Sequence, residues 1–248
     1  MSLYDIAKVS RVHQILLSTG EIDRLPESKI ENIKNNVSVD HTLWLEKDIV
    51  NLIRDNFSPK TLEAFNKIKP LAYKADLARY CILYVYGGWY FDLSIDIVDF
   101  SVLKNYGDDY QVVIFRDVPS AGESYAIGNS VLWFRNREHP VLEDVIARVT
   151  ENILSEKYEN HPHSITGPNV LGEFIVRYQL DTKDSNILIG DTVMIDNRPS
   201  HIFNDAIRPN FLIFSKRRGM DVDMSDILPS GYETKSNYWG MFYDKKVY

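Results

Sequence analysis

Two short stretches decide how this chain folds: YKADLARY at residues 73–80 and GGWYFDLSID at residues 87–96. The first lies in a helix predicted from about Pro70 to Tyr86, which the pair Gly87-Gly88 ends. We expect at least one of these glycines to have a positive φ. The second stretch predicts a strand, because apolar and polar residues alternate from Trp89 to Val98. A helix that passes through two glycines into a strand is typical of an α/β protein.

The rest of the chain continues this alternation of strands and helices. Further strands are predicted at residues 9–17, 41–45, 111–115, 125–134, 187–195 and 211–214, and further helices at residues 26–35, 46–57, from 58 onward, 139–155 and 168–180. The order predicts an α/β fold with a mostly parallel central sheet flanked by helices. We expect one domain over residues 1–248, with a helical insertion at about residues 46–70.

Composition excludes several classes of protein. The chain has 248 residues, of which 44% are hydrophobic and 25% charged, so global disorder is excluded. A net charge of −7 disfavours nucleic acid as a partner. Cys81 is the only cysteine, which favours a reducing compartment. Residues 1–10 lack the apolar core of a signal peptide, and the uncharged stretch at 80–91 is too short to span a membrane, so we expect a cytoplasmic protein.

The candidate chemistry lies on one face of the predicted strand, which carries Tyr90, Asp92, Ser94 and Asp96. On a regular strand Asp92 and Asp96 lie about 13 Å apart, so both reach one metal ion only if the strand breaks after Leu93. Asp76 and Arg79 are three residues apart and project from one face of the helix. The simpler interpretations are an exposed ion pair on the helix and a strand with one polar face.

Together these motifs resemble the sugar-binding region of the family 32 glycosyltransferases, which include yeast initiating mannosyltransferases, capsule and lipopolysaccharide transferases and clostridial glucosylating toxins. The family pattern is an Asp-x-x-Arg helix followed by Gly-Gly-x-Tyr-x-Asp-x-Asp. Residues 76–79 and 87–94 match it, except that Ser94 replaces the last acid. Weaker matches lie at residues 12–15, 41–44, 166–168 and 237–240.

The resemblance implies a GT-A fold and a nucleotide-sugar donor. Asp76 and Arg79 would then hold hydroxyls of the donor sugar, and Asp92 would contact the ribose or the metal side of the diphosphate; these three are the catalytic candidates. The remaining residues expected to contact the donor are His13, Gln14, Ile15, Tyr90, Asn237 and Trp239. Backbone at residues 13–15 would flank the base, and the Trp239 indole would close over the phosphates.

The resemblance also implies a divalent cation, Mn²⁺ or Mg²⁺, which neutralises a departing diphosphate. The expected ligands are Asp92, Ser94 and Asp96. A serine hydroxyl is a poorer ligand than a carboxylate, so three alternatives stay open. Ser94 binds the metal weakly or through water, Asp96 replaces the missing acid after a turn, or donor binding depends little on metal.

The predicted function is transfer of a hexose or N-acetylhexosamine from a UDP- or GDP-linked donor to a hydroxyl of a surface glycan or lipid-linked saccharide. The resemblance implies retention of anomeric configuration. Peripheral association with the inner membrane face is an alternative to a purely cytoplasmic location. The competing hypothesis is a non-catalytic sugar-nucleotide or glycan-binding module; a glycosidase that uses Asp92 and Asp96 fits poorly. His161 and His163 lie in a predicted loop, with acceptor binding as the alternative reading.

Overall fold

The computed structural model describes residues 11–18, 22, 25, 27–37, 40–100, 110–118, 123–158, 160–184, 186–203, 211–216 and 240–248. The strands are β1 (Val12–Leu16), β2 (His41–Leu45), β3 (Gly88–Phe91), β4 (Ile95–Ile97), β5 (Val112–Arg116), β6 (Ile127–Phe134), β7 (Ile187–Ile195), β8 (Arg198–Phe203) and β9 (Phe211–Lys216). The helices are α2 (Glu27–Val37), α3 (Glu46–Asn56), α4 (Pro59–Lys67), α5 (Leu71–Tyr86), α6 (Pro140–Leu154), α7 (Pro168–Thr182) and α8 (Gly240–Tyr243), with a 3₁₀ turn η3 at Pro162–Ser164. The predicted α/β class is confirmed.

The described strands form one mixed sheet in the order β2-β1-β3-β6-β5-β7-β8-β9-β4. Parallel pairing joins β1 to β2 and β3, and β5 to β7. The remaining neighbours pair in antiparallel fashion. The predicted mostly parallel sheet is therefore wrong. The physical reason is that β6 returns between β3 and β5, and that β7, β8 and β9 follow one another as an antiparallel meander.

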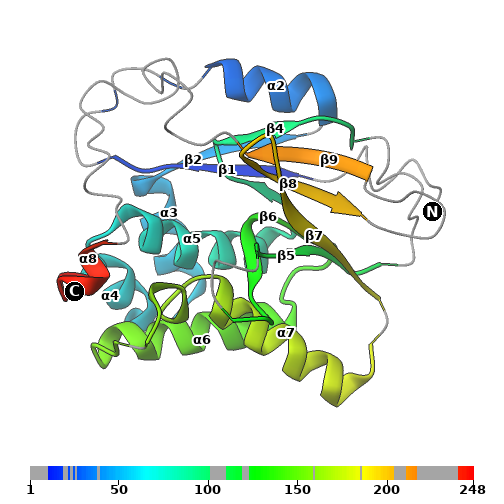
Figure 1. Ribbon diagram of the computed structural model, residues 1–248. Helices are drawn as coiled ribbons and strands as arrows, with labels where there is room; N and C mark the ends of the chain where they lie inside the picture. Colours follow the sequence, from blue (N-terminus) through cyan, green and yellow to red (C-terminus); the bar gives the residue numbers. More distant parts are fainter. Residues whose placement is uncertain are drawn as a thin grey trace.

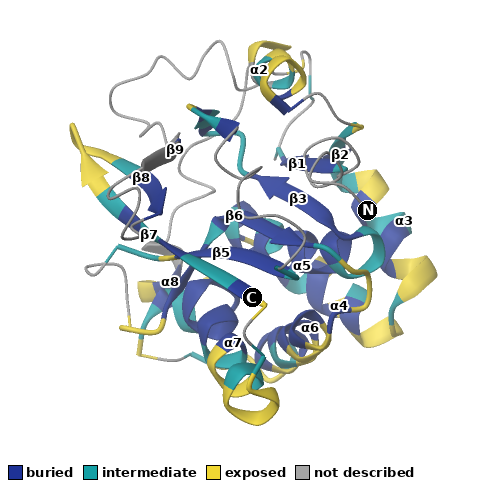
Figure 2. Cartoon of the chain, turned by 90° about the vertical axis from the view of Figure 1, so that its right-hand side faces the viewer, coloured by how far each residue is buried: buried dark blue, intermediate teal, exposed yellow. Residues whose placement is uncertain are grey.

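Helices α3 to α7 lie on one side of the sheet and α2 lies on the other (Figure 1). The core on the first side joins the helices to the sheet and includes Tyr80 and Leu83 of α5. The core on the second side joins Trp89 and Phe91 of β3 to Phe214 of β9. Figure 2 shows β3 as buried along its length and β5 and β6 as mostly buried. The motif-bearing elements α5 and β3 are thus in the middle of the fold.

The strand predicted at residues 89–98 is broken in two. β3 ends at Phe91, and the chain then turns, with the Ile95 amide donating to the Asp92 carbonyl at 3.0 Å. After this turn β4 pairs with β9 at the far edge of the sheet. The alternation of the sequence is nevertheless correct, because Trp89, Phe91 and Ile95 all reach the same core. The condition for Asp92 and Asp96 to act together, a break in the strand, is therefore met.

The glycine pair after α5 has the predicted positive φ at both positions, +63° at Gly87 and +91° at Gly88. A Cβ atom on Gly88 would collide with the Arg11 carbonyl, which accepts a hydrogen bond of 2.8 Å from the Trp89 amide. The pair therefore lets α5 end and β3 begin directly beside β1.

Helices α3 and α4 fill most of the range predicted as a helical insertion. Ser58 caps α4, and its hydroxyl accepts a hydrogen bond from the Thr61 amide at 3.4 Å. The division of the whole chain into one domain stays a prediction. Within the part of the chain that the structure describes, no helix has both the length and the apolar character of a membrane span.

Candidate functional site

Asp76 and Arg79 form an ion pair inside the protein. They lie one turn apart on α5, and Arg79 Nη2 is 3.3 Å from Asp76 Oδ1. Both residues are buried, because α5 packs against neighbours on nearly every side. The alternative of an exposed ion pair is therefore wrong. A buried pair must satisfy its charges with further partners, since burial removes water from both groups.

Arg79 finds those partners on two strands. Its Nη2 lies 3.4 Å from Asp92 Oδ1, just after β3. Its Nη1 donates to the Asn129 carbonyl of β6 at 2.5 Å. The guanidinium carbon lies 4.7 Å from the centre of the Tyr90 ring. Arg79 thus links α5 to β3 and β6 through a single side chain.

Both carboxylate oxygens of Asp76 accept hydrogen bonds. Asn129 Nδ2 donates to Oδ1 at 2.8 Å, and Thr166 Oγ1 donates to Oδ2 at 2.7 Å. Gly167 lies directly against the same carboxylate, since a Cβ added there would be 3.4 Å from Oδ2. The turn before α7 therefore fixes Asp76 from the side opposite to Asn129.

The charges of this group depend on one another. Burial raises the pKa of the Asp76 carboxyl, while Arg79 and the Thr166 hydroxyl act in the opposite direction. Burial alone would lower the pKa of Arg79, but Tyr90, Asp92 and Asp76 outweigh it and hold that pKa above its usual value. Arg79 is therefore the permanent positive charge around which the acids are arranged.

Asp92 is the acid of the group that reaches solvent. Its side chain is 23% exposed, and Oδ1 accepts a hydrogen bond of 2.8 Å from the buried Tyr90 hydroxyl. Burial raises the pKa of Tyr90 well above its usual value, so this hydroxyl keeps its proton and acts as a donor. We call Asp76, Arg79, Tyr90, Asp92, Asn129 and Thr166 the Asp92 cluster.

The predicted base-binding residues of β1 do not join this cluster by side-chain contact. His13 Nδ1 accepts a hydrogen bond from the Trp44 indole at 3.2 Å, and His13 Nε2 lies 3.0 Å from the Gly87 carbonyl. Burial lowers the pKa of His13 to about 4, so it is a neutral, structural histidine. Gln14 pairs with His41, and Ile15 packs into the helical core. A role of this backbone in base binding stays a prediction.

The predicted metal ligands follow one another around the turn after β3. Ser94 lies in the turn itself, and Asp96 lies in β4, opposite Ser215 of β9. Among the described residues there is no group of three acids, histidines or cysteines that would hold a metal ion without help. Asp92 alone brings a carboxylate to the cluster's open side. This donor set fits a hard cation that takes most of its oxygen ligands from substrate phosphates and water.

The other two residues expected at the donor, Asn237 and Trp239, lie outside the described residues. Their contact with the phosphates stays a prediction.

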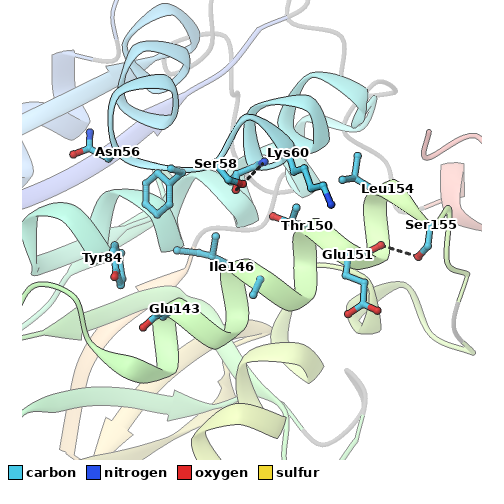
Figure 3. Close-up of a pocket in the computed structure, with 13 residues that line it drawn as sticks. Asn56, Ser58, Lys60, Tyr84, Glu143, Ile146, Thr150, Glu151, Leu154 and Ser155 are labelled. Carbon is cyan, nitrogen blue, oxygen red and sulfur yellow. Dashed lines mark hydrogen bonds between the residues drawn. The ribbon is translucent and has the colours of Figure 1, made fainter.

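A groove of about 780 Å³ lies apart from the Asp92 cluster (Figure 3). It runs between the corner that joins α3 to α4 and the outer face of α6, and Tyr84 of α5 closes one end. Its lining includes Phe57, Ile146 and Leu154, and it contains no residue of the Asp92 cluster. The groove also has charged groups, Lys60, Glu143 and Glu151, at its wall, but it lies away from the Asp-x-x-Arg helix face and the strand that carry the sequence motif, so we place the candidate site at Asp92.

Comparison with known families supports this placement. Residues 23–113 match the family model described as "Glycosyltransferase sugar-binding region containing DXD motif". The match includes α5 and β3, and with them Asp76, Arg79 and Asp92. Residues 23–113 are thus similar to a glycosyltransferase sugar-binding region. This region ends in β5, so Asn129 and Thr166 come from the part of the chain beyond it.

Two known proteins are similar to this chain, one in sequence and one in structure. "Uncharacterized glycosyltransferase L373" of Acanthamoeba polyphaga mimivirus is 27% identical over 180 residues, which are 71% of this chain and 66% of that protein, just under two thirds of its length. The solved structure "PaToxG Glycosyltransferase" superimposes with a TM-score of 0.53 at 15% identity, over 73% of this chain and 76% of that one. The fold is therefore the GT-A type that the resemblance implied.

The contacts of two members of the Asp92 cluster, Thr166 and Asn129, were not predicted from the sequence. Thr166 belongs to a Thr-Gly-Pro turn that was part of the resemblance, but no local pattern shows that its hydroxyl meets Asp76. Asn129 gives its amide to Asp76 and its carbonyl to Arg79. The signal that points to it is the polar pair Asn129 and Ser130 directly after Gly128 in β6.

Proposed function

We propose that the protein transfers a hexose or N-acetylhexosamine from a UDP- or GDP-linked donor to a hydroxyl of a glycan or lipid-linked saccharide. The observation that carries the proposal is the Asp92 cluster, in which one partly exposed acid is fixed by a buried arginine at the carboxyl end of β3. Ligands of α/β proteins bind outside the carboxyl ends of the strands. The sugar-binding region found by comparison contains the same three charged residues.

Within this proposal the residues have different roles. Asp92 meets the donor, because its carboxylate is the charged group of the cluster that reaches solvent. Arg79 and Asp76 hold Asp92 and the β6 backbone in position, and contact donor hydroxyls where the cluster opens to admit the sugar. Tyr90 orients the Asp92 carboxylate by its hydrogen bond.

We propose that Mg²⁺ or Mn²⁺ assists the reaction, held by Asp92 together with phosphate oxygens and water. When bound, the cation neutralises charge on the departing nucleoside diphosphate. The bond between the anomeric carbon and the phosphate oxygen breaks, and the diphosphate leaves with the electron pair. The acceptor oxygen bonds to the anomeric carbon, and its proton passes to the departing phosphate. This same-face route gives retention, which NMR of the product's anomeric proton tests directly.

The test of the proposed function is a screen of UDP- and GDP-sugars for donor hydrolysis with Mn²⁺, with Mg²⁺ and with chelator. Asp92→Asn removes the charge and keeps the shape of the side chain. Asp191→Asn is the matched control, because Asp191 also pairs with an arginine, Arg116, at 2.8 Å but lies outside the cluster. We expect hydrolysis of one donor by the wild type and by Asp191→Asn, and a loss of at least about 100-fold in Asp92→Asn.

Equal hydrolysis by the two variants would contradict the site assignment. The second candidate function, a module that binds sugar nucleotides without turnover, is favoured by Ser94 at the position of the second acid. Tight donor binding with no hydrolysis and no transfer would support that candidate instead. A cytoplasmic or inner-membrane location is likewise a proposal, which cell fractionation tests.

A further inference from the structure

A small polar pocket lies between the first turns of α7, the end of α6 and the segment before β6. Its volume is about 200 Å³. The side chains that line it and enter the argument are Tyr125, Arg148, Asn152, Ser164, Asn169 and Glu173. No function has been given to any of them so far. The volume is below the range of about 300–1,000 Å³ for drug-sized ligands, so the pocket suits a single small ring.

The pocket shares one turn of the chain with the Asp92 cluster. Asn152 Nδ2 donates to the Ile165 carbonyl at 2.9 Å, and Ile165 precedes the Thr166 that donates to Asp76. On the other side of Thr166, Asn169 Nδ2 donates to Ser164 Oγ at 2.9 Å. The residues that build the pocket wall therefore also fix the turn that holds Asp76. A ligand in the pocket would lie one turn of chain away from the candidate donor site.

The groups in the pocket wall match the hydrogen bonding of sugars. Each sugar hydroxyl both donates and accepts, so a saccharide site needs acceptors and donors side by side. Asn152 is 3% exposed, its Nδ2 donates to the Ile165 carbonyl, and its amide side chain lines the pocket. Arg148 Nη1 lies 3.4 Å from Glu173 Oε2, so the pocket wall has a cationic donor beside an anionic acceptor. Tyr125 is 41% exposed and adds a ring surface for the apolar face of a pyranose.

We infer that this polar pocket is the acceptor subsite and that it holds one saccharide ring of the acceptor. The inference rests on the proposed function and gives the acceptor saccharide a binding site in the fold.

The two arginines that pair with Glu173 provide a matched test. Arg148 and Arg177 both form an ion pair with Glu173, and their guanidinium carbons lie 5.3 and 5.4 Å from the centre of the Phe174 ring. Only Arg148 lines the pocket. Arg148→Met and Arg177→Met therefore each remove one ion pair with Glu173 and one contact with the Phe174 ring, but only the first variant changes the pocket.

The probes are methyl glycosides of glucose, galactose, mannose and N-acetylglucosamine. Saturation-transfer NMR measures their binding to the full chain without donor, and product analysis measures the ratio of transfer to donor hydrolysis. We expect at least one glycoside to bind and to accept sugar, and Arg148→Met to lower both its affinity and the transfer-to-hydrolysis ratio about tenfold. Arg177→Met keeps the wild-type values. Thermal unfolding of both variants checks that each is folded.

The outcomes separate this inference from the proposed function. Donor hydrolysis with no glycoside binding would overturn the inference and leave the proposed donor chemistry standing. Transfer to a peptide hydroxyl in place of a saccharide would contradict both the inference and the proposed acceptor. Equal effects of the two arginine variants would also overturn the inference. Glycoside binding that responds to Arg148→Met in a protein that neither hydrolyses a donor nor transfers its sugar would contradict the transferase, and with it the assignment of the pocket to an acceptor.

Discussion

Thr166 Oγ1 donates a hydrogen bond of 2.7 Å to Asp76 Oδ2, across 90 residues of sequence. The contact ties the turn before α7 to the middle of α5, and both partners are buried. It therefore joins the part of the chain that matches the sugar-binding family to the part that follows it.

Replacing this hydroxyl by a methyl group tests how much the contact contributes. Thr166→Val keeps the side-chain shape but leaves the buried Asp76 without one of its donors, so we expect a loss of about 1–3 kcal/mol in the free energy of unfolding. Thr182→Val is the control, because Thr182 makes an exposed hydrogen bond to the Tyr178 carbonyl at 2.7 Å. Urea denaturation of the two variants gives the comparison, and a Thr166 variant as stable as the control would contradict the prediction.

Alanine substitution should lower the free energy of unfolding far more at Gly88 than at Gly128. Gly88→Ala places a Cβ against the Arg11 carbonyl at a φ of +91°, and we expect a loss of at least about 2 kcal/mol or no soluble protein. At Gly128 a Cβ would meet its nearest neighbour at an ordinary 3.6 Å. Gly128→Ala should therefore change the free energy of unfolding by less than about 1 kcal/mol. Chemical denaturation of both variants measures the two losses in the free energy of unfolding, and equal losses would contradict the prediction.

His13 makes the stability depend on pH. Its pKa is about 4 in the folded protein and 6.5 as the ordinary value, so the unfolded chain binds more protons between these limits. The stabilising effect of neutral His13 is complete above about pH 6.5 and is lost as the pH falls toward 4. The difference in stability between wild type and His13→Gln should therefore shrink by about 2 kcal/mol from pH 7.5 to pH 5. Denaturation curves at the two pH values measure it; a constant difference would show that His13 titrates normally.

Restoring the second acid tests the metal proposal. Ser94→Asp adds a carboxylate two residues after Asp92, and we expect Mn²⁺ to bind about tenfold more tightly in the presence of UDP or GDP. Ser94→Asn is the uncharged control and should bind like the wild type. Calorimetric titration with Mn²⁺ gives the affinities. If Ser94→Asp leaves the affinity unchanged and Asp96→Asn lowers it, Asp96 supplies the second acid.

Local sequence patterns predicted most of the fold. Strands such as residues 41–45 and the helix around residues 140–154 were predicted nearly to their ends, because apolar spacing there agrees with the burial that the fold imposes. β8 was missed: Arg198 and Pro199 begin it, and a proline within a run weakens the sequence signal for a strand. The antiparallel pairing of β6 is a property of strand order, which local patterns do not contain.

For the site, the sequence named the acids but not their arrangement. Asp76 and Arg79 were expected on one helical face, and their motif identified them. The bridge from Arg79 to Asp92 and the contacts of Asn129 depend on packing between elements that are far apart in the sequence. The sequence assigned no partner to the His13 ring, whose two nitrogens face partners in the core. Base binding by the backbone at residues 13–15 stays a prediction.

The short link between β3 and β4 has a geometrical consequence for Asp92. β3 is third and β4 is ninth in the order of the sheet, so on a flat sheet they would lie about 29 Å apart. The chain from Phe91 to Ile95 reaches at most about 15 Å. The sheet must therefore curl until its last strand returns over its middle, and the rings of Phe91 and Phe214 lie 5.2 Å apart inside that curl. Asp92 lies in the short link between β3 in the middle of the sheet and β4 at its end, so its position is set by both parts of the sheet together.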